Sequence, residues 1–277
     1  MKRLALLGSP VDQALSPALH RAAYAELGLP WTYEAIDLQP DQLGPFLAEL
    51  DSTWAGFSLT MPLKQTVVDL LDETSATVRT TGTANTIVVT DAGRLRGENT
   101  DLHGMLQALA DTGMTAVTDV TVLGAGATAS TALAAAHRLG CRTATVVTRD
   151  LLRSRKLQTA AERIGINIRL RPWTQAAQHL DAGLVIAAVP PHAADSLAVS
   201  WPGPWPTLMD VTYRPWPSRL ARTAARLGSR VIGGLPMLIH QAAEQCALQT
   251  GRKDSVHSAM CRAAEGAAIM DVDPLVE

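Results

Sequence analysis

The stretch "VTVLGAGATA", residues 120–129, decides the fold of this 277-residue chain. Its first four residues predict a buried strand, and Gly124, Gly126 and Ala129 follow in the pattern G-x-G-x-x-A at the start of an alanine-rich helix. The first glycine of this pattern allows a tight turn, the second lets the main chain approach a pyrophosphate, and the small third residue lets the helix pack on the strand. Amide groups at the helix start then face the phosphates. The stretch predicts a Rossmann-type dinucleotide-binding domain, with a purely structural glycine turn as the alternative.

The strand after this motif, "TATVVT" at residues 143–148, indicates which dinucleotide is bound. An NAD-binding domain usually has an acidic residue at the end of this strand for the ribose 2′-hydroxyl, whereas an arginine there binds the 2′-phosphate of NADP. Here Arg149 follows Thr148, and Arg153 lies four residues further on. These charges favour NADP, although charged residues are also ordinary at a solvent-exposed helix start. Asp150 keeps NAD open, because its carboxylate could contact an unphosphorylated ribose.

Outward from this motif, short apolar runs alternate with amphipathic stretches of helical length, which is typical of β-α-β units around a mostly parallel sheet. The first unit places a helix after "RLALLG", with Ser16 as its N-cap and Gly28 at its end. The segment "NTIVVTDAGRLRGENTD" reads as a hairpin. The chain is long enough for two cores, so we expect a substrate-binding catalytic domain over 1–102, the dinucleotide-binding domain over 103–235, and C-terminal helices over 236–277 that pack on the first domain.

Composition favours a small-molecule partner. The formal net charge is −2 and the sequence has no basic run, which argues against nucleic acid and against an acidic membrane surface. The three cysteines are too few and too widely spaced for a disulfide framework or a metal site, so we expect a reducing, cytoplasmic location and no bound metal. The apolar run near the N-terminus is too short to span a bilayer. The sequence leaves open whether the protein is a monomer or a homodimer.

Lys64, in "SLTMPLKQ", is a candidate for chemistry. It follows the end of a predicted strand, where α/β folds collect ligands. Reduction of a ketone by hydride transfer needs a proton donor beside the developing alkoxide, and a lysine ammonium supplies one. Asp101 in "GENTD" and Asn85 in "TANTI" could orient that ammonium and bind a polyol. Each also has an ordinary explanation: an exposed lysine at a helix start, an N-cap and a turn residue.

The motifs "GSPVDQALSPALH", "SLTMPLKQ", "GTANTI", "GENTD", "GAGATA", "TRD" and "GGLPMLIHQAA" together make the chain resemble the shikimate dehydrogenase family along nearly its whole length. The resemblance implies an N-terminal α/β substrate domain, a Rossmann NADP domain and last helices that return to the first domain. It implies the NADPH-dependent reduction of 3-dehydroshikimate to shikimate, in aromatic amino acid biosynthesis.

The resemblance also assigns residues. Lys64 and Asp101 correspond to the catalytic pair of the family. The substrate-binding positions that it implies are Ser16, Thr60, Asn85, Tyr213 and Gln241. The cofactor-binding positions are Gly124, Gly126, Ala127, Arg149, Arg153, Gly234 and Met237, the last two beside the nicotinamide.

The chain departs from the family pattern at three places. Ala14 replaces the first of two serines that hold the substrate carboxylate, and loss of one hydrogen bond to a charged group costs about 1.5 to 3 kcal/mol. "AAV" at 187–189 replaces an Asn-Ala-Thr segment, and Asp150 replaces a threonine. Two further readings therefore stay open: a dehydrogenase acting on quinate or an amino-shikimate, and a non-catalytic dinucleotide-binding sensor.

Overall fold

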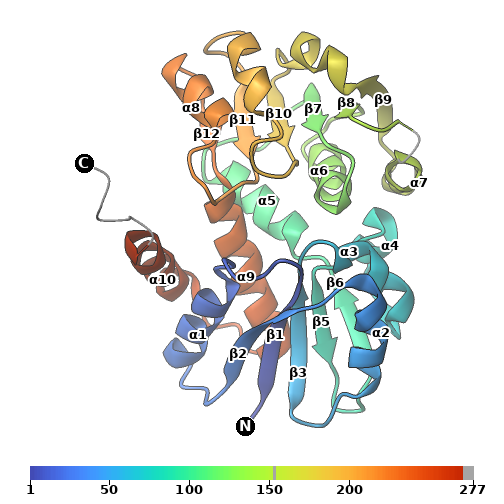
Figure 1. Ribbon diagram of the computed structural model, residues 1–277, viewed down its shortest axis with the longest axis vertical. Coiled ribbons are helices and arrows are strands. Elements are labelled where there is room, and N and C mark those ends of the chain that lie inside the picture. Colours follow the sequence, from blue (N-terminus) through green and yellow to red (C-terminus); the bar gives the residue numbers. More distant parts are fainter. Residues whose placement is uncertain (152–153, 271–277) are drawn as a thin grey trace. The chain divides into compact units, whose positions relative to one another are not determined.

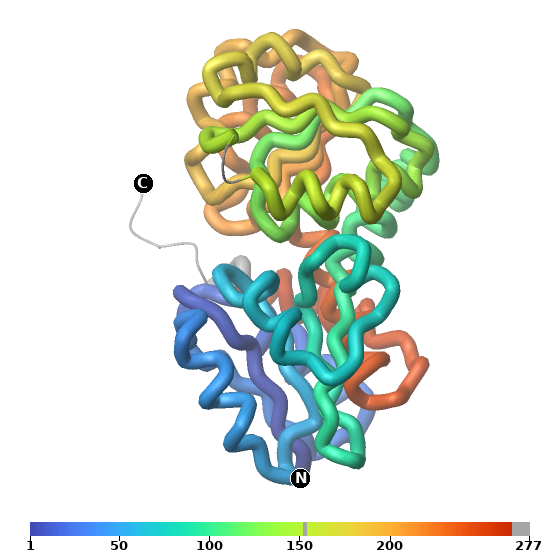
Figure 2. The backbone as a smooth tube through the Cα atoms, turned by 90° about the vertical axis from the view of Figure 1, so that its right-hand side faces the viewer, coloured from blue at the N-terminus to red at the C-terminus, as the bar shows by residue number. Residues whose placement is uncertain are grey.

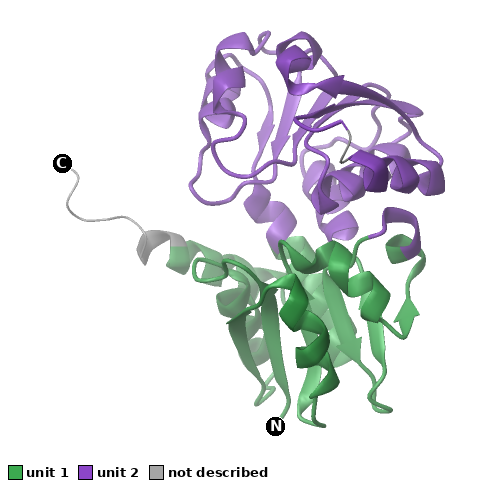
Figure 3. Ribbon diagram, turned by 45° about the vertical axis from the view of Figure 1, so that its right-hand side comes forward, with its two compact units in different colours: residues 1–78, 83–100, 239–277 green, residues 79–82, 101–238 purple. Residues whose placement is uncertain are grey.

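The computed structural model describes residues 1–151 and 154–270 (Figure 1). Contacts divide the chain into two compact units, which Figure 3 distinguishes by colour. Unit 1 comprises residues 1–78, 83–100 and 239–277, and unit 2 comprises residues 79–82 and 101–238. In the described part of the chain, no helix is both long enough and apolar enough to cross a membrane.

Unit 1 is built on a mixed six-stranded sheet in the order β2-β1-β3-β5-β6-β4. Its strands are β1 (Arg3–Gly8), β2 (Thr32–Asp37), β3 (Trp54–Leu59), β4 (Glu73–Thr74), β5 (Thr86–Val89) and β6 (Leu95–Glu98). Strands β1, β2 and β3 run parallel to one another, whereas β5 is antiparallel to both β3 and β6. The pairing of β5 with β6 confirms the predicted hairpin.

Both faces of this sheet are covered. The helical segments of unit 1 are α1 (Ser16–Glu26), α2 (Pro40–Ala48), α3 (Leu63–Thr66), η1 (Val67–Leu70), α10 (His257–Met270), and parts of α4 (Ala76–Thr81) and α9 (Gly234–Thr250). Phe57 and Leu59 of β3 join the apolar core with α2, while Ser58 between them bonds to Gln245 of α9. This alternation follows from the two-residue period of a strand. Because α10 packs against α1, the C-terminal helices do return to the N-terminal unit, as the sequence predicts.

One local prediction was wrong. Ser16 is not the N-cap of α1, because Leu15 occupies that position. Leu15 already has helical torsion angles, φ −80° and ψ −19°, and its carbonyl accepts the hydrogen bond from the amide of Leu19. The helix therefore begins one residue earlier than the serine-proline pattern indicates. Gly28 does lie just past its end, with a left-handed φ of 63°.

Unit 2 has a six-stranded parallel sheet in the order β12-β11-β10-β7-β8-β9. The strands are β7 (Val120–Leu123), β8 (Thr143–Thr148), β9 (Asn167–Pro172), β10 (Leu184–Ala187), β11 (Thr207–Asp210) and β12 (Val231–Ile232). The chain order grows outward on both sides of β7, which is the doubly wound order of a Rossmann domain. Figure 2 traces this unit from green through yellow to orange.

Helical segments cover both faces of this second sheet. They are α5 (Asp101–Ala110), α6 (Ala127–Arg138), α7 (Arg155–Ile164), η3 (Trp173–His179), η4 (Asp195–Ser200) and α8 (Arg219–Arg226). Val122 of β7 belongs to the core under α5, α6 and α7, and the next residue, Leu123, belongs to the core under η3, η4 and α8. The first break in strand order, between β7 and β10, places the glycine motif at the carboxyl edge of the sheet, where such folds bind ligands.

Candidate functional site

The glycine motif of unit 2 forms a main-chain turn in which position 124 accepts only glycine. Gly124 has φ +111°, and a Cβ on it would lie 2.4 Å from the carbonyl oxygen of Ala188. Gly126 is the N-cap of α6 in an extended conformation, without a side chain that caps the helix, and a Cβ on it would meet no atom within 4 Å. Ala127 begins the helix. Gly126 therefore places no side chain beside the amide groups of the first turn of α6. This leaves room for an anion to approach these amides.

Arg149 lies directly after β8, and its side chain is exposed. The amide of Asp150 donates a hydrogen bond to Thr148 Oγ1 at 3.3 Å, which holds the main chain at this turn. The placement is the one expected of a residue that binds a phosphate beyond the strand end. Arg153 lies outside the described residues.

Gly234 and Met237 lie in the first turn of α9. A Cβ on Gly234 would come within 2.1 Å of the carbonyl oxygen of Val211, and the amide of Gly234 donates to the carbonyl of Thr212 at 3.1 Å. The glycine is required because α9 starts directly against the segment that follows β11. The side chain of Met237 is 7% exposed and packs in the apolar core of unit 2. A role for Met237 beside a nicotinamide thus remains a prediction.

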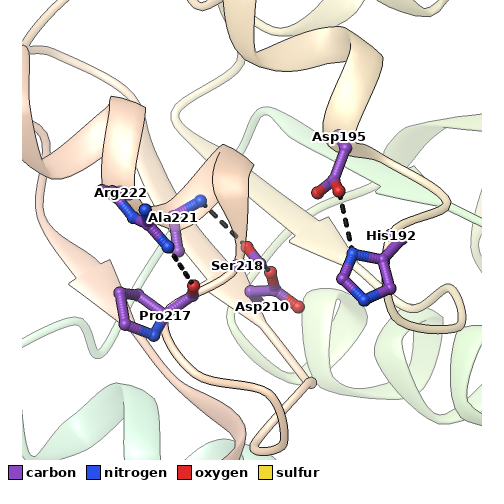
Figure 4. A network of polar contacts seen from close by, with 7 residues as sticks. All are labelled: His192, Asp195, Asp210, Pro217, Ser218, Ala221 and Arg222. Carbon is purple, nitrogen blue, oxygen red and sulfur yellow. Dashed lines mark hydrogen bonds and ion pairs between the residues drawn. The ribbon is translucent and has the colours of Figure 1, made fainter. Parts of the chain in front are cut away.

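Tyr213 lies on the segment after β11. Asp210 and Ser218 are hydrogen-bonded to each other and close this segment into a loop (Figure 4). Ser218 Oγ donates to Asp210 Oδ2 at 2.6 Å, and the amide of Thr212 donates to Asp210 Oδ1 at 3.0 Å. Ser218 also caps α8 by accepting from the amide of Ala221 at 3.0 Å. The sequence reasoning missed Asp210; its signal is an acidic residue at the end of an apolar strand.

A cavity of about 220 Å³ lies beside this loop. Figure 4 shows two of its lining residues, His192 and Asp195, whose Nδ1 and Oδ2 atoms are 3.0 Å apart. The lining residues are Pro191, His192, Asp195, Thr212, Pro215, Pro217, Ser218, Arg219 and Arg222.

In unit 1, Thr60 and Lys64 follow the end of β3. The amide of Thr60 donates to the carbonyl of Leu7 at 2.9 Å, which ties the turn to β1. Lys64 is half-buried in α3, and its carbonyl accepts the amide of Ala84 at 2.8 Å. The main chain of Lys64 is therefore anchored next to Asn85.

Asn85 is the centre of a buried polar cluster in unit 1. Its side chain is 1% exposed, and Nδ2 donates to Thr100 Oγ1 and to Gln241 Oε1, each at 3.0 Å. Asn85 Oδ1 accepts the amide of Thr100 at 2.8 Å and the hydroxyl of Thr86 at 2.8 Å. The structure thus brings two of the predicted substrate residues, Asn85 and Gln241, into direct contact across 156 positions of sequence.

The remaining predicted residues of the site are Ser16, Asp101 and Tyr213. Ser16 is 6% exposed at the start of α1 in unit 1, and Ala14 lies two residues earlier, in the loop before the helix. Asp101, 4% exposed, is the first residue of α5 and follows Thr100 directly in the chain. Asp101 and Tyr213 both belong to unit 2. The pairing of Lys64 with Asp101 stays a prediction.

A second set of buried polar groups is hydrogen-bonded to this cluster. The sequence patterns did not predict it. His20 Nε2 lies 3.2 Å from Gln245 Oε1, and Gln245 Nε2 donates to the carbonyl of Asn85 at 3.0 Å. The His20 ring stacks on Tyr33, with ring centroids 4.3 Å apart. Burial lowers the pKa of His20 to about 4, against the opposing effect of the Gln245 hydrogen bond. His20 is therefore neutral at neutral pH.

This pKa predicts an acid-sensitive stability. The unfolded chain protonates His20 near its ordinary pKa of 6.5, whereas the folded chain does so only near 4. The unfolded state therefore binds more protons between these values, and the free energy of unfolding should fall by about 3 kcal/mol as the pH drops through that window.

Urea unfolding of the wild type and of His20→Leu at about pH 7.5 and about pH 4.5 measures this effect. The variant should lose roughly 2 to 3 kcal/mol less than the wild type between the two conditions. An equal loss in both proteins would contradict the assignment.

These features define a class: a two-unit α/β oxidoreductase, with a Rossmann dinucleotide-binding unit and a second unit that carries buried amides beside a lysine. A family model described as "Shikimate dehydrogenase substrate binding domain" matches residues 6–87. The chain is 33% identical to shikimate dehydrogenase (NADP(+)) of Synechococcus sp. strain JA-3-3Ab over 263 residues, which cover 90% of this chain and 88% of that relative. The chain belongs to the shikimate dehydrogenase family.

Solved structures agree with this membership. Shikimate 5-dehydrogenase from Thermus thermophilus, in complex with NADP(H) and shikimate, is 33% identical with a TM-score of 0.82, covering 96% of this chain and 100% of that one. Quinate dehydrogenase from Corynebacterium glutamicum, in complex with NAD, is 27% identical with a TM-score of 0.84, covering 96% and 99%. The family resemblance and the predicted fold class are confirmed.

Proposed function

We propose that this protein catalyses the reversible NADPH-dependent reduction of 3-dehydroshikimate to shikimate. The observation that carries the proposal is the contact between Asn85 and Gln241, in the unit that also holds Lys64. Two amides with fixed orientation suit a substrate with several hydroxyl groups, because each hydroxyl both donates and accepts. The family relationship over 90% of the chain supports the same reaction.

In this proposal Lys64 supplies the proton. When bound, NADPH provides the hydride that adds to the C3 carbonyl carbon. The ammonium of Lys64 polarises the C3 oxygen and donates the proton that completes the new hydroxyl, and Asp101 positions Lys64. Thr60, Asn85 and Gln241 bind ring hydroxyls, while Ser16 and Tyr213 bind the carboxylate end.

The residues of unit 2 fit a dinucleotide. The turn at Gly124 and the open approach at Gly126 leave the amides of the first turn of α6 for the pyrophosphate. Arg149 and Arg153 are placed in sequence to bind a 2′-phosphate, which favours NADP, and Asp150 leaves NAD as the alternative cofactor. A cytoplasmic location and a monomeric or homodimeric state belong to the same proposal and rest on the sequence.

Ala14 favours a second candidate, a dehydrogenase of quinate or an amino-shikimate. A methyl group here cannot give the hydrogen bond that a serine would give to the substrate carboxylate. The affinity for shikimate would then be about ten- to a hundred-fold weaker unless another group compensates.

Absorbance near 340 nm tests both candidates. We expect shikimate with NADP⁺ to yield NADPH, with a kcat/KM above those for quinate and the amino analogues. A higher value for one of these analogues would assign the protein to the second candidate. NADPH binding by calorimetry without turnover of any of these polyols would overturn both and support a non-catalytic sensor.

A further inference from the structure

We infer that Gln245, on α9, is a positioning residue that, together with the main-chain amide of Thr100, sets the direction of the hydrogen bonds of Asn85 and, through Asn85, of Gln241. The inference rests on the proposed function, in which Asn85 and Gln241 bind substrate hydroxyls. Gln245 is 1% exposed, so its effect must pass through its neighbours in the protein.

The amide of Gln245 has only one possible orientation. Its Nε2 faces the carbonyl oxygen of Asn85 at 3.0 Å, and a carbonyl oxygen can only accept. A flipped amide would place two acceptors against each other. Oε1 therefore points the other way, where it accepts from Ser58 Oγ at 2.9 Å and from His20 Nε2 at 3.2 Å. The proton of neutral His20 is thus on Nε2.

The second Nε2 hydrogen of Gln245 determines the direction of the next hydrogen bonds, which lead to Asn85. It is donated to Thr86 Oγ1 at 3.0 Å, so the hydroxyl of Thr86 donates onward to Asn85 Oδ1 at 2.8 Å. The amide of Thr100 also donates to Asn85 Oδ1, at 2.8 Å. Asn85 must then present Nδ2 to Gln241 Oε1, which makes Oε1 the end of Gln241 that faces Asn85. Gln245, through Thr86, and the main-chain amide of Thr100 thereby hold Asn85 in one orientation, which determines the end of Gln241 that faces Asn85.

The far side of Gln245 is held rigidly. Ser58 Oγ accepts from Tyr33 Oη at 2.6 Å, and Tyr33 stacks on the His20 ring at an interplanar angle of 6°. Burial raises the pKa of the Tyr33 hydroxyl, which keeps it a donor. Gln245 uses both donors and both acceptor lone pairs in this frame, so its amide has no alternative arrangement.

The same helix offers a matched control in Gln249, one turn further along. Gln249 is also buried, at 6% exposure, and its Nε2 donates to the carbonyls of Phe57 at 3.2 Å and Ile87 at 3.4 Å. Neither of these carbonyls belongs to a proposed site residue. Gln249 therefore matches Gln245 in residue type, helix and burial, and it also donates to main-chain carbonyls, but within the described part of the chain it has no connection to Asn85 and its buried Oε1 has no hydrogen-bond partner.

The test compares Gln245→Met with Gln249→Met in shikimate oxidation. We expect the KM for shikimate to rise about ten- to a hundred-fold in Gln245→Met, with kcat within about threefold and the KM for NADP⁺ unchanged. Gln249→Met should keep the wild-type KM for shikimate. A merely structural role would lower the fraction of folded enzyme, and therefore the apparent kcat, without raising this KM; that result would overturn the inference.

A double-mutant cycle with Asn85→Ala sharpens the test. If Gln245 acts through Asn85, the two substitutions should be non-additive, and Gln245→Met should change KM less than about threefold when Asn85 is already alanine. Additive effects would overturn the inference. Should Gln245→Met not fold, Thr86→Val removes only the hydroxyl that links Gln245 to Asn85, and it should also raise the KM for shikimate.

Side-chain amide NMR separates this inference from the proposed function. The NH₂ signals of Asn85 and Gln241 should shift in Gln245→Met and stay in place in Gln249→Met, with no substrate present. A wild-type protein that oxidises no polyol would refute the proposed function alone. Unshifted amide signals in Gln245→Met would refute the positioning role.

Discussion

Replacing Lys64 by alanine should lower kcat for shikimate oxidation by roughly 10²- to 10⁴-fold, the range typical for loss of a positioned proton donor or acceptor. The shortened side chain removes the ammonium while the carbonyl of Lys64 still accepts the amide of Ala84, so the turn after β3 should keep its conformation. Steady-state kinetics measure the loss in kcat. Calorimetric titration with NADPH should show nearly unchanged affinity, because the glycine motif belongs to unit 2.

Lys156 is the matched control for this experiment. It is an exposed lysine on α7, and Lys156→Ala removes the same charge without touching unit 1. We expect wild-type kinetics from this variant. Wild-type turnover in Lys64→Ala would show that the proton comes from another group, and the proposed role of Lys64 would be wrong.

Arg149→Ala should weaken NADPH binding about ten- to a hundred-fold and leave NADH binding within about twofold, because charge-assisted bonds to a phosphate contribute about 1.5 to 3 kcal/mol. The side chain is exposed just beyond β8, so its removal should not disturb the core. Dissociation constants for the two cofactors, measured by calorimetry on the same preparation, provide the comparison.

Arg138→Ala controls for a general loss of positive charge. Arg138 is exposed at the last residue of α6, at the opposite end of that helix from Gly126. It should leave both dissociation constants unchanged. Equal weakening of NADPH and NADH in Arg149→Ala would refute a 2′-phosphate contact, and Asp150 would then become the candidate for a ribose contact.

Local patterns predicted most of the architecture. The strands and helices follow from residue periodicity, and the turn at Gly124 follows from a conformation that other residues rarely adopt. The mistake at Ser16 has a local cause too: a serine before a proline fits the N-cap pattern, but Leu15 had already entered the helical conformation. The first residue of the helix cannot be predicted from the local pattern alone, because helix boundaries depend on packing as well as on caps.

The candidate site was predicted as a set of residues rather than as an arrangement. Motif resemblance selected Asn85 and Gln241, and the structure adds that they are hydrogen-bonded to each other. Gln245 and His20 were not selected, because a glutamine on a helix and a histidine before a helical tyrosine carry no distinctive local pattern. Their contact joins positions 225 residues apart, and no spacing rule covers that distance.

By itself, the sequence determined the Rossmann unit, the cofactor type it favours and the family resemblance, because glycine turns, strand periodicity and charge at a strand end are properties of neighbouring residues. Only the tertiary structure decided the direction of hydrogen bonds from Gln245 through Asn85 to Gln241. Such a direction exists only when donors and acceptors from distant segments are buried together, where each must find a partner other than water.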